Sequence, residues 1–330
     1  MNRRSFCQSA CSAAVWGISS AAVSRVWAAD PFPNKPIRFI IPYAAGGGPD
    51  VQARVLGPKL GEILGQAIVI ENKVGAAGVL AAQFVAQSPA DGYTLLMGSN
   101  THLIQKIMSP DLKFDPLLDF VPVSNVAASP TVMVVRADAP YKTVQDLVAA
   151  AKSSPGKMNY GSGGIGTSAH LAGATLVSLA GFQAVHIPLK GSVEITASLI
   201  RGDIDFAFPV AATGVPQVKG GTLRALAVTG KTRLKELPDV PTLQEALRNE
   251  LAVQESWFGI WVPARTPSDV VGKLHGAVTR ALRDPGLRAI FEAGGSTPAI
   301  SESPQAFAAF VGTENAKWAE IVKLSGVKAH

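Results

Sequence analysis

The sequence predicts an α/β protein with two doubly wound lobes and a central cleft. Short apolar segments alternate with segments of helical periodicity along most of the chain, which is typical of sheets with helices on both faces. The chain has 330 residues, more than a single hydrophobic core usually holds. About a dozen strands are expected, which is too many for one regular sheet in a chain of this length.

Short apolar runs predict the strands. The first run ends at Pro42, and the third follows the turn Asp91-Gly92. Nine of the expected strands can be placed, in chain order at residues 35–41, 67–70, 93–97, 131–135, 159–160, 184–187, 204–208, 223–228 and 258–262.

Apolar residues at helical spacing predict the helices. One such face runs through residues 50–64, although Gly57-Pro58 should weaken its middle. Residues 143–146, Thr-Val-Gln-Asp, resemble a capping box at a helix start. In chain order, helices are expected at residues 50–64, 78–86, 143–152, 167–179, 193–201, 267–283, 285–293 and 303–323.

The domain organisation follows from the alternation of elements. Parallel strands with helical crossovers form largely parallel sheets covered on both faces. There is no internal repeat or low-complexity linker, so we expect the chain to cross between lobes on strands, near Val134 and within residues 240–255. Residues 29–134 and 250–330 would then form the first lobe, and residues 135–249 the second.

Composition excludes several classes of protein. Hydrophobic residues make up 47% and charged residues 16% of the chain, which excludes a disordered protein. No apolar run reaches the roughly 18 residues of a membrane-spanning helix. The formal net charge is +6 and there is no block of basic residues, so no nucleic-acid partner is expected.

Residues 1–28 are expected to be a cleavable export signal. Arg3-Arg4 precedes a mildly apolar stretch, and Ala28 ends a small-residue cleavage pattern. The two arginines fit a twin-arginine signal, and a general secretory signal stays open. Both cysteines, Cys7 and Cys11, would leave with the signal. The mature chain would then have no disulfide, thiol nucleophile or cysteine metal site.

A glycine-rich loop at residues 42–50 follows the first predicted strand and opens a helix. Its three consecutive glycines let backbone N–H groups converge. The N-terminus of the following helix adds a partial positive charge that suits a carboxylate or phosphate. The alternative is a tight turn with Asp50 as the helix cap. No Gly-Lys-Ser/Thr follows, so the loop is not a P-loop.

A second glycine-rich loop, residues 160–170, also joins a strand to a helix. Residues 161–166 match Gly-x-Gly-x-x-Gly, but residues 185–190 lack the acid that a dinucleotide-binding fold places about twenty residues later. No cofactor is therefore expected, while anion or amide binding by N–H groups and by Ser162, Thr167 and Ser168 remains open.

Two further loops follow predicted strands. Residues 98–102 carry small hydrogen-bonding side chains suited to a polar ligand, or form a turn with a capped helix. Residues 208–213 are mostly apolar and could form one wall of a cleft. Ligands of open α/β sheets bind outside the carboxyl ends of the strands. All four loops lie at such ends, so they would surround one cleft if the lobes face each other.

Catalytic and metal-binding patterns are mostly missing. No pair of the five histidines has metal-ligand spacing, and there is no Gly-x-Ser-x-Gly nucleophile elbow. A Ser162–His170 pair with a distant acid stays open, because catalytic triads assemble in space. An exported α/β enzyme acting on a small organic acid is therefore the main alternative to a binding protein. A scaffolding module fits poorly with glycine-rich loops gathered at strand ends.

The chain resembles the Bug-type solute receptors of tripartite tricarboxylate transporters. The resemblance rests on an ordered set of segments that spans nearly all of residues 31–330. These segments are residues 35–38, 42–50, 71–78, 90–96, 160–167, 170–173, 186–192, 202–205, 221–229, 237–242, 257–259 and 263–267.

The resemblance implies a periplasmic binding protein of type II-like fold, whose two lobes close on one small carboxylate. It implies permease subunits as partners, a monomer, and no catalysis, cofactor or metal. A receptor that has lost its transporter and serves sensing is the weaker alternative. The expected ligand-binding residues are Tyr43, Ala44, Ala45, Gly46, Gly47, Asp50, Ser99, Asn100, Thr101, Ser162, Gly166, Thr167, His170 and Pro209.

Two departures from the family pattern affect the first loop. Residues 44–46 are Ala-Ala-Gly where the family usually has Pro-Gly-Gly, and Pro49 stands where Thr or Ser is common. Pro49 removes one N–H donor. The sequence does not choose between dicarboxylates, tricarboxylates, acidic amino acids, nicotinate-like rings and aromatic acids as the ligand.

Overall fold

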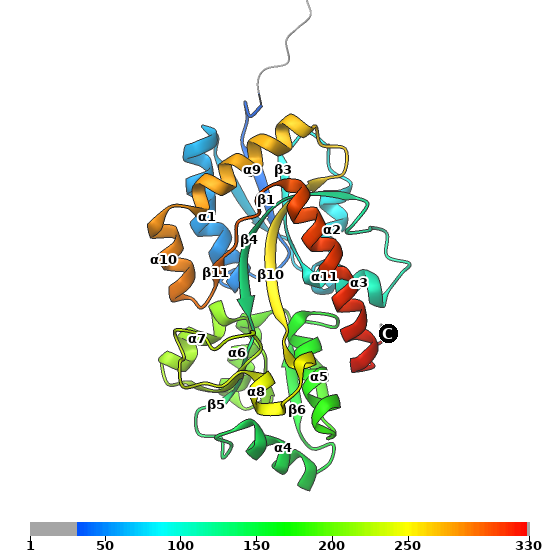
Figure 1. Cartoon of the computed structure of the whole chain (residues 1–330), viewed down its shortest axis with the longest axis vertical. Helices are drawn as coiled ribbons and strands as arrows, with labels where there is room; N and C mark the ends of the chain where they lie inside the picture. The colour runs from blue at the N-terminus through cyan, green and yellow to red at the C-terminus, as the bar shows by residue number, and fades with distance from the viewer. Residues whose placement is uncertain (1–31, 329–330) are drawn as a thin grey trace, which may run out of the picture. The chain divides into compact units, whose positions relative to one another are not determined.

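The strands form two separate sheets in the computed structural model, which describes residues 32–328 (Figure 1). The predicted export signal, both cysteines and His330 lie outside these residues. The first sheet has the order β11-β4-β10-β3-β1-β2. Its strands are β1 (Ile37–Ile41), β2 (Ile68–Asn72), β3 (Thr94–Ser99), β4 (Phe120–Pro130), β10 (Glu255–Pro263) and β11 (Thr297–Pro298).

The second sheet has the order β7-β6-β8-β5-β9. Its strands are β5 (Val132–Arg136), β6 (Asn159–Ser162), β7 (Val185–Pro188), β8 (Phe206–Ala207) and β9 (Leu223–Val228). The predicted α/β class is confirmed, but both sheets are mixed rather than largely parallel. β10 pairs antiparallel with β3 and β4, and β5 pairs antiparallel with β8 and β9. β10 re-enters the first sheet from the second, and β5 enters the second sheet from the first, so each runs against its neighbours.

Helices cover both faces of the first sheet. Along β1, Ile37, Phe39 and Ile41 pack toward one face, and Ile40 packs toward the other. This alternation follows from the two-residue period of a strand. The first face is covered by α1 (Gly48–Leu64), α9 (Ser268–Leu282) and α10 (Pro285–Ala293). The other is covered by α2 (Val79–Ala86), α3 (Asn100–Met108) and α11 (Pro304–Ser325).

The second sheet has its own hydrophobic core, centred on Phe206, Phe208 and the residues of β5. The helices packed around it are α4 (Val144–Ser153), α5 (Ser168–Ala180), α6 (Ser192–Arg201), α7 (Ala211–Lys219) and α8 (Leu243–Leu247). Two short 3-10 helices complete the elements, η1 (Ala76–Gly78) and η2 (Glu250–Ala252). None of the helices in residues 32–328 is both long and apolar enough to cross a membrane.

The two connections between the sheets lie side by side. Thr131 alone separates β4 from β5, and the chain returns between β9 and β10. At this point the Thr131 and Thr229 hydroxyls lie 2.9 Å apart, and the Thr229 N–H donates to the Thr131 carbonyl at 2.9 Å. The long strands β4 and β10 run together toward this crossing (Figure 1). The crossing is therefore a narrow, hydrogen-bonded pair of backbones.

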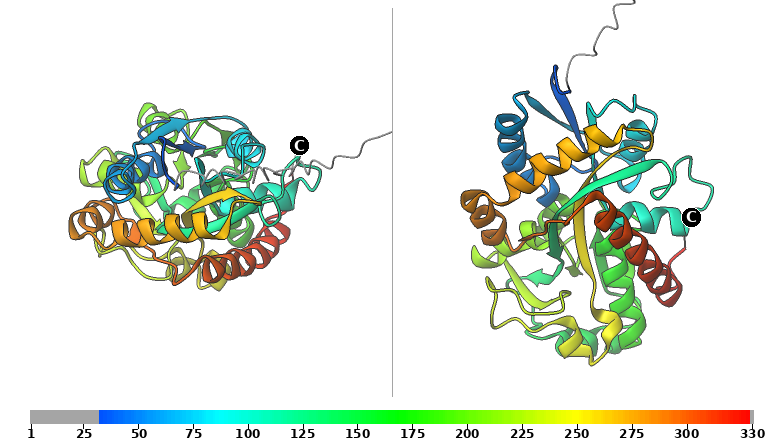
Figure 2. Two further views of the ribbon diagram at one scale, coloured as in Figure 1. Left: turned by 90° about the horizontal axis from the view of Figure 1, so that it is seen from above. Right: turned by 45° about the horizontal axis from the view of Figure 1, so that its top comes forward.

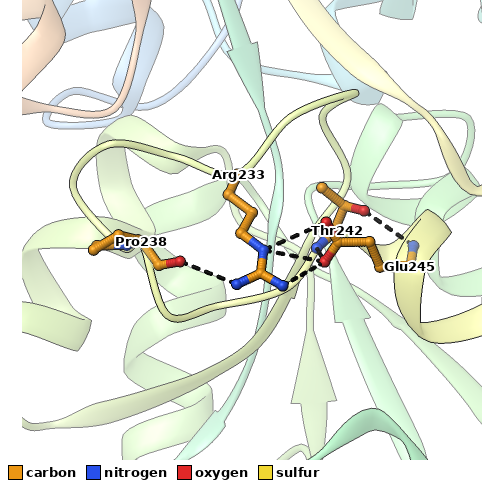
Figure 3. A network of polar contacts seen from close by, with 4 residues as sticks. All are labelled: Arg233, Pro238, Thr242 and Glu245. Carbon is orange, nitrogen blue, oxygen red and sulfur yellow. Dashed lines mark hydrogen bonds and ion pairs between the residues drawn. The ribbon is translucent and has the colours of Figure 1, made fainter.

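The return connection is ordered by an ion pair (Figure 3). The Arg233 guanidinium lies 2.9 Å from a Glu245 carboxylate oxygen and also donates to the Pro238 carbonyl. Glu245 accepts from the Thr242 N–H at 3.2 Å, and its own N–H donates to the Thr242 hydroxyl at 3.0 Å. These two bonds form the capping box of α8. Arg233 thus closes the loop onto the start of α8.

Helix α11 contacts elements of both sheets. It starts beside the first sheet and runs down to α5, as Figure 1 and the right-hand view of Figure 2 show. Trp318 is fully buried and packs with Ile104 of α3 and Leu171 of α5. The carboxylate of Glu314 accepts from the indole N–H groups of Trp257 and Trp318, both at 2.9 Å. The C-terminal helix therefore joins the two halves on one side.

Candidate functional site

A cavity of about 50 Å³ lies between the two sheets, at the carboxyl ends of β1, β3, β6 and β7. The loops that follow these strands, the start of α7 and one residue of β10 supply its walls. The lining residues are Tyr43, Ala44, Gly47, Pro49, Thr101, Gly163, Thr167, Ser168, Ala169, Gly191, Ser192, Val193, Ile195, Val210 and Phe258.

Five helix N-termini meet at this cavity. Each of α1, α3, α5, α6 and α7 places a residue of its cap or first turn in the lining. Unpaired N–H groups and the helix dipole make such a terminus partially positive. Within residues 32–328, no Lys, Arg, Asp or Glu side chain is among the lining residues. The electrostatic character of the cavity is therefore set by backbone groups and hydroxyls.

The first loop is held by Asp50. Gly46 N–H donates to the Asp50 carboxylate at 2.8 Å, which also accepts from Arg54 Nε at 2.9 Å and Asn72 Nδ2 at 2.8 Å. Burial alone would raise the pKa of Asp50, but these hydrogen bonds outweigh it and lower the pKa. Asp50 is thus ionised and shapes the loop, and it does not line the cavity.

Few N–H groups of the first loop point freely at the cavity. Gly47 N–H donates to the Ala44 carbonyl at 3.3 Å, and Gly48 N–H donates to the hydroxyl of Thr213 at 3.1 Å. Thr213 belongs to α7, so the second bond joins the two halves of the protein. Pro49, the departure noted in the sequence, lies in the lining itself. Tyr43, Ala44 and Gly47 line the cavity, whereas Ala45 and Gly46 are exposed outside it.

The loop at residues 98–102 is a capped helix start. Ser99 N–H donates to His102 Nδ1 at 3.1 Å, and the Ser99 hydroxyl lies 3.2 Å from the Tyr43 hydroxyl. Burial lowers the pKa of His102 to about 4 and raises the pKa of Tyr43. Both side chains are therefore neutral near pH 7. Of this loop only Thr101 lines the cavity, while Ser99 and Asn100 stand behind it.

Two histidines stabilise the second glycine-rich loop, residues 160–170, through hydrogen bonds. Gly166 N–H donates to His170 Nδ1 at 3.1 Å, and the Ser162 hydroxyl lies 2.6 Å from His186 Nε2. The two imidazoles stack with centroids 3.8 Å apart. The Ser162 hydroxyl also donates to the Gly164 carbonyl at 3.0 Å. The predicted residues Ser162, Gly166 and His170 thus shape the loop, while Thr167 and Ser168, also named from the sequence, line the cavity.

The Ser162 hydroxyl contacts an imidazole other than that of His170, which the sequence suggested as its catalytic partner. The imidazole beside the Ser162 hydroxyl is that of His186, and that of His170 accepts from a backbone N–H. No cluster of three or more metal-ligating side chains occurs among the described residues. The arrangement suits binding through backbone and hydroxyl groups.

Sequence reasoning missed two parts of the wall. One is the start of α6, where Gly191, Ser192, Val193 and Ile195 line the cavity. The signal was available, because a strand followed by Gly-Ser at a helix start repeats the pattern of the other loops. The other part is Phe258, whose ring lies edge-on to that of Tyr43 with the ring centroids 6.5 Å apart. In the sequence, Phe258 looks like an ordinary core residue of a strand. In the loop at residues 208–213 the lining residue is Val210, the neighbour of the predicted Pro209.

Comparison with known proteins gives one consistent result. The family model for the tripartite tricarboxylate transporter family receptor matches residues 52–327. The chain is 38% identical to "UPF0065 protein in gbd 5'region" of Cupriavidus necator over 87% of each chain. It is 32% identical to Protein BugT of Bordetella pertussis, covering 94% of this chain and 95% of BugT.

Solved structures agree with these relatives. The periplasmic binding protein BugD is 29% identical with a TM-score of 0.86, covering 91% of this chain and all of that one. Rpa4515 of R. palustris with adipate is 30% identical with a TM-score of 0.86, covering 90% of this chain and 99% of that one. MatC from Rhodopseudomonas palustris with bound malate is 29% identical with a TM-score of 0.82, covering 88% of this chain and all of that one.

Proposed function

The chain belongs to the receptor family of tripartite tricarboxylate transporters, and from this premise we propose that it captures a small carboxylate in the cavity between its two sheets. It does so in the periplasm, for the permease of such a transporter. Residues 1–28 serve as the cleavable signal for its export, and the receptor works as a monomer.

The convergence of five helix N-termini carries this proposal. Each terminus stabilises a nearby anion by roughly 0.3–1 kcal/mol, and more where the geometry is partly buried. Hydroxyls of Thr101 and Ser192 also line the cavity and add directed hydrogen-bonding groups. Similar structures hold adipate and malate, which are small carboxylates. A carboxylate bound here would be neutralised by dipoles rather than by a side-chain cation.

Capture occurs by closure of two lobes. We take residues 32–130 with 255–328 as one lobe and residues 132–254, which include α8, as the other, hinged at the Thr131–Thr229 crossing. Contacts such as Gly48 N–H to Thr213, and the Gln105 amide to the Ile165 carbonyl, form only when the lobes are together. A ligand that touches both lobes adds to these contacts and shifts the equilibrium toward the closed form. The permease would recognise that closed form.

Calorimetric titration of the refolded protein with a panel of acids tests the proposal. The panel contains malate, succinate, adipate, citrate and glutamate, with the dimethyl ester of adipate as the uncharged control. Unfolding and refolding first removes any ligand that co-purifies. In urea unfolding of the same protein, a true ligand at about a thousand times its Kd should add roughly 4 kcal/mol to the free energy of unfolding. We expect at least one acid to bind and to be recovered unchanged.

A pair of isosteric variants places the binding in this cavity. Thr101→Val removes one hydroxyl from the lining and should weaken binding about fivefold, the loss of one neutral hydrogen bond. Thr279→Val on α9 is the matched control, because its hydroxyl is buried without a hydrogen-bond partner and lies outside the lining. Conversion of the acid would favour the enzyme alternative. Failure of every acid to bind would refute the proposed function.

A further inference from the structure

A second, larger hollow adjoins the ligand cavity. We call it the side groove; its volume is about 450 Å³, and it shares Tyr43 and Gly163 with the cavity. The segment that follows β2 and the C-terminal half of α3 form one wall, and the loops after β6 and β7 form the other. The side groove therefore lies between the same two lobes and continues the cavity toward solvent.

The side groove is mainly apolar. The apolar side chains that give it this character are Val74, Ala76, Ala77, Met108, Ile165 and Leu189. Val74 is 42% exposed although its side chain is apolar. Such a surface beside a polar binding cavity suits an apolar part of the same ligand, because burying it removes apolar area from water on both partners.

The wall after β2 is held in a costly backbone conformation. Ala76 and Ala77 have φ angles of 45° and 51°, between Gly75 at 148° and Gly78 at 94°. Left-handed angles are unfavourable for residues with a Cβ and persist only where the surroundings fix them. Here Ala77 faces Gly164 of the other lobe, where an added Cβ would lie 3.2 Å from the Ala77 Cβ. The two walls thus meet closely and define the shape of the side groove.

One cation stands at the side groove. Lys190 is the charged side chain of its lining within residues 32–328. Among the same residues no carboxylate forms an ion pair with its ammonium group. The backbone N–H of Lys190 donates to a Glu194 carboxylate oxygen at 2.7 Å, which fixes the point from which the Lys190 side chain starts. An anionic group that reached the side groove would find this ammonium group available.

We propose that the side groove is a second part of the ligand site and that the ligand is an elongated α,ω-dicarboxylate. One carboxylate sits among the five helix N-termini, the apolar spacer lies along the side groove, and the far carboxylate pairs with Lys190. This inference rests on the proposed function and adds the length and the second charge of the ligand to it.

Titration with succinate, adipate, suberate and the monoacid hexanoate tests this inference. Each methylene buried in the side groove should tighten binding about fourfold until the spacer fills it. Lys190→Met removes the cation and keeps most of the side-chain stem, and it should weaken adipate or suberate binding about tenfold. Hexanoate binding should not change. Lys152→Met on α4 has the same change in net charge far from the site and should bind all four acids like the wild type.

A second variant tests the apolar wall. Val74→Glu places a carboxylate in the side groove at an exposed position, so folding should be unaffected. It should weaken suberate binding and leave succinate binding unchanged. If short and long diacids bind equally, or if Lys190→Met weakens hexanoate as much as adipate, the inference is wrong while the carboxylate receptor stands. If no acid of any length binds, the proposed function fails as well.

Discussion

His102 offers a sharp test of how the ligand loops are supported, through the variant His102→Gln. The ring is fully buried and packs on Phe114 and Trp261, and its Nδ1 accepts from the Ser99 N–H. Burial lowers the pKa of His102 from 6.5 to about 4. Glutamine at this position can keep the acceptor of a capping box and cannot titrate. The variant should therefore lose one component of the pH dependence of stability.

The sign and size of this pH dependence follow from the difference in proton binding between the native and the unfolded chain. The unfolded chain takes up a proton at His102 below about pH 6.5, and the native protein takes it up only near pH 4. Stability is thus complete above pH 6.5 and is lost as the pH falls toward 4. A difference of about 2.5 pKa units corresponds to about 3 kcal/mol in total, of which about 2 kcal/mol is lost by pH 5. The wild type should lose this amount between pH 7.5 and pH 5, and His102→Gln should not.

Urea unfolding at several pH values between 7.5 and 5 measures the difference. The buffers must contain no carboxylate, since acetate or citrate could bind and stabilise the native state. His275→Gln is the control, because His275 lies on α9 and its Nε2 is 2.9 Å from the Ser301 carbonyl, away from the ligand loops. The test is the pH dependence of the difference between variant and wild type. If the curves of His102→Gln and wild type run parallel, the burial argument is wrong.

Three further predictions concern closure and packing. Gly48→Ala adds a methyl group 2.9 Å from the Val210 side chain of the other lobe, so ligand affinity should fall at least tenfold and small-angle scattering should show a larger particle. A normal scattering curve with normal affinity would contradict this. Trp318→Ala should reduce the free energy of unfolding by about 3–5 kcal/mol in urea titrations, and a loss below 1 kcal/mol would show that α11 does not join the two halves. Asp50→Asn removes the carboxylate that accepts from the Gly46 N–H, so it should lower the free energy of unfolding by about 1–3 kcal/mol at pH 7. That difference should shrink as the pH falls below about 4, because the pKa of Asp50 is lowered.

Much of the fold follows from local patterns in the sequence. Strands such as β1 and β9 are apolar runs between polar turns, and α5 and α6 carry helical spacing with a cap or glycine at their ends. β4 was missed because its sequence contains Pro122 and several small polar residues, which disfavour a strand. The structure places Pro122 at an irregularity of its pairing with β10, where the missing N–H does no harm. Helix α7 was missed because Gly214 and Pro216 break its pattern.

The same limits apply to the candidate site. Loops at the carboxyl ends of strands could be identified from glycine and hydroxyl residues, and the structure brings them to one cavity. The direction of individual side chains could not. Asp50 and His170 belong to these loops but turn away from the cavity to bind the loop backbone. Phe258 comes from a strand of a different part of the chain, so only the tertiary pairing of β10 with β3 brings it beside Tyr43.

The position of β10 affects the order in which the strands of the two sheets become available during synthesis. β10 lies between β3 and β4 in the first sheet, yet it begins at Glu255 whereas β4 ends at Pro130. At typical synthesis rates the intervening chain takes on the order of 10 s to emerge. During that interval β3 and β4 have no partner between them, and closing this gap requires contacts of long sequence separation, which slow folding. Every strand of the second sheet ends by Val228, so all of them are synthesised before β10, the strand that the first sheet needs for completion.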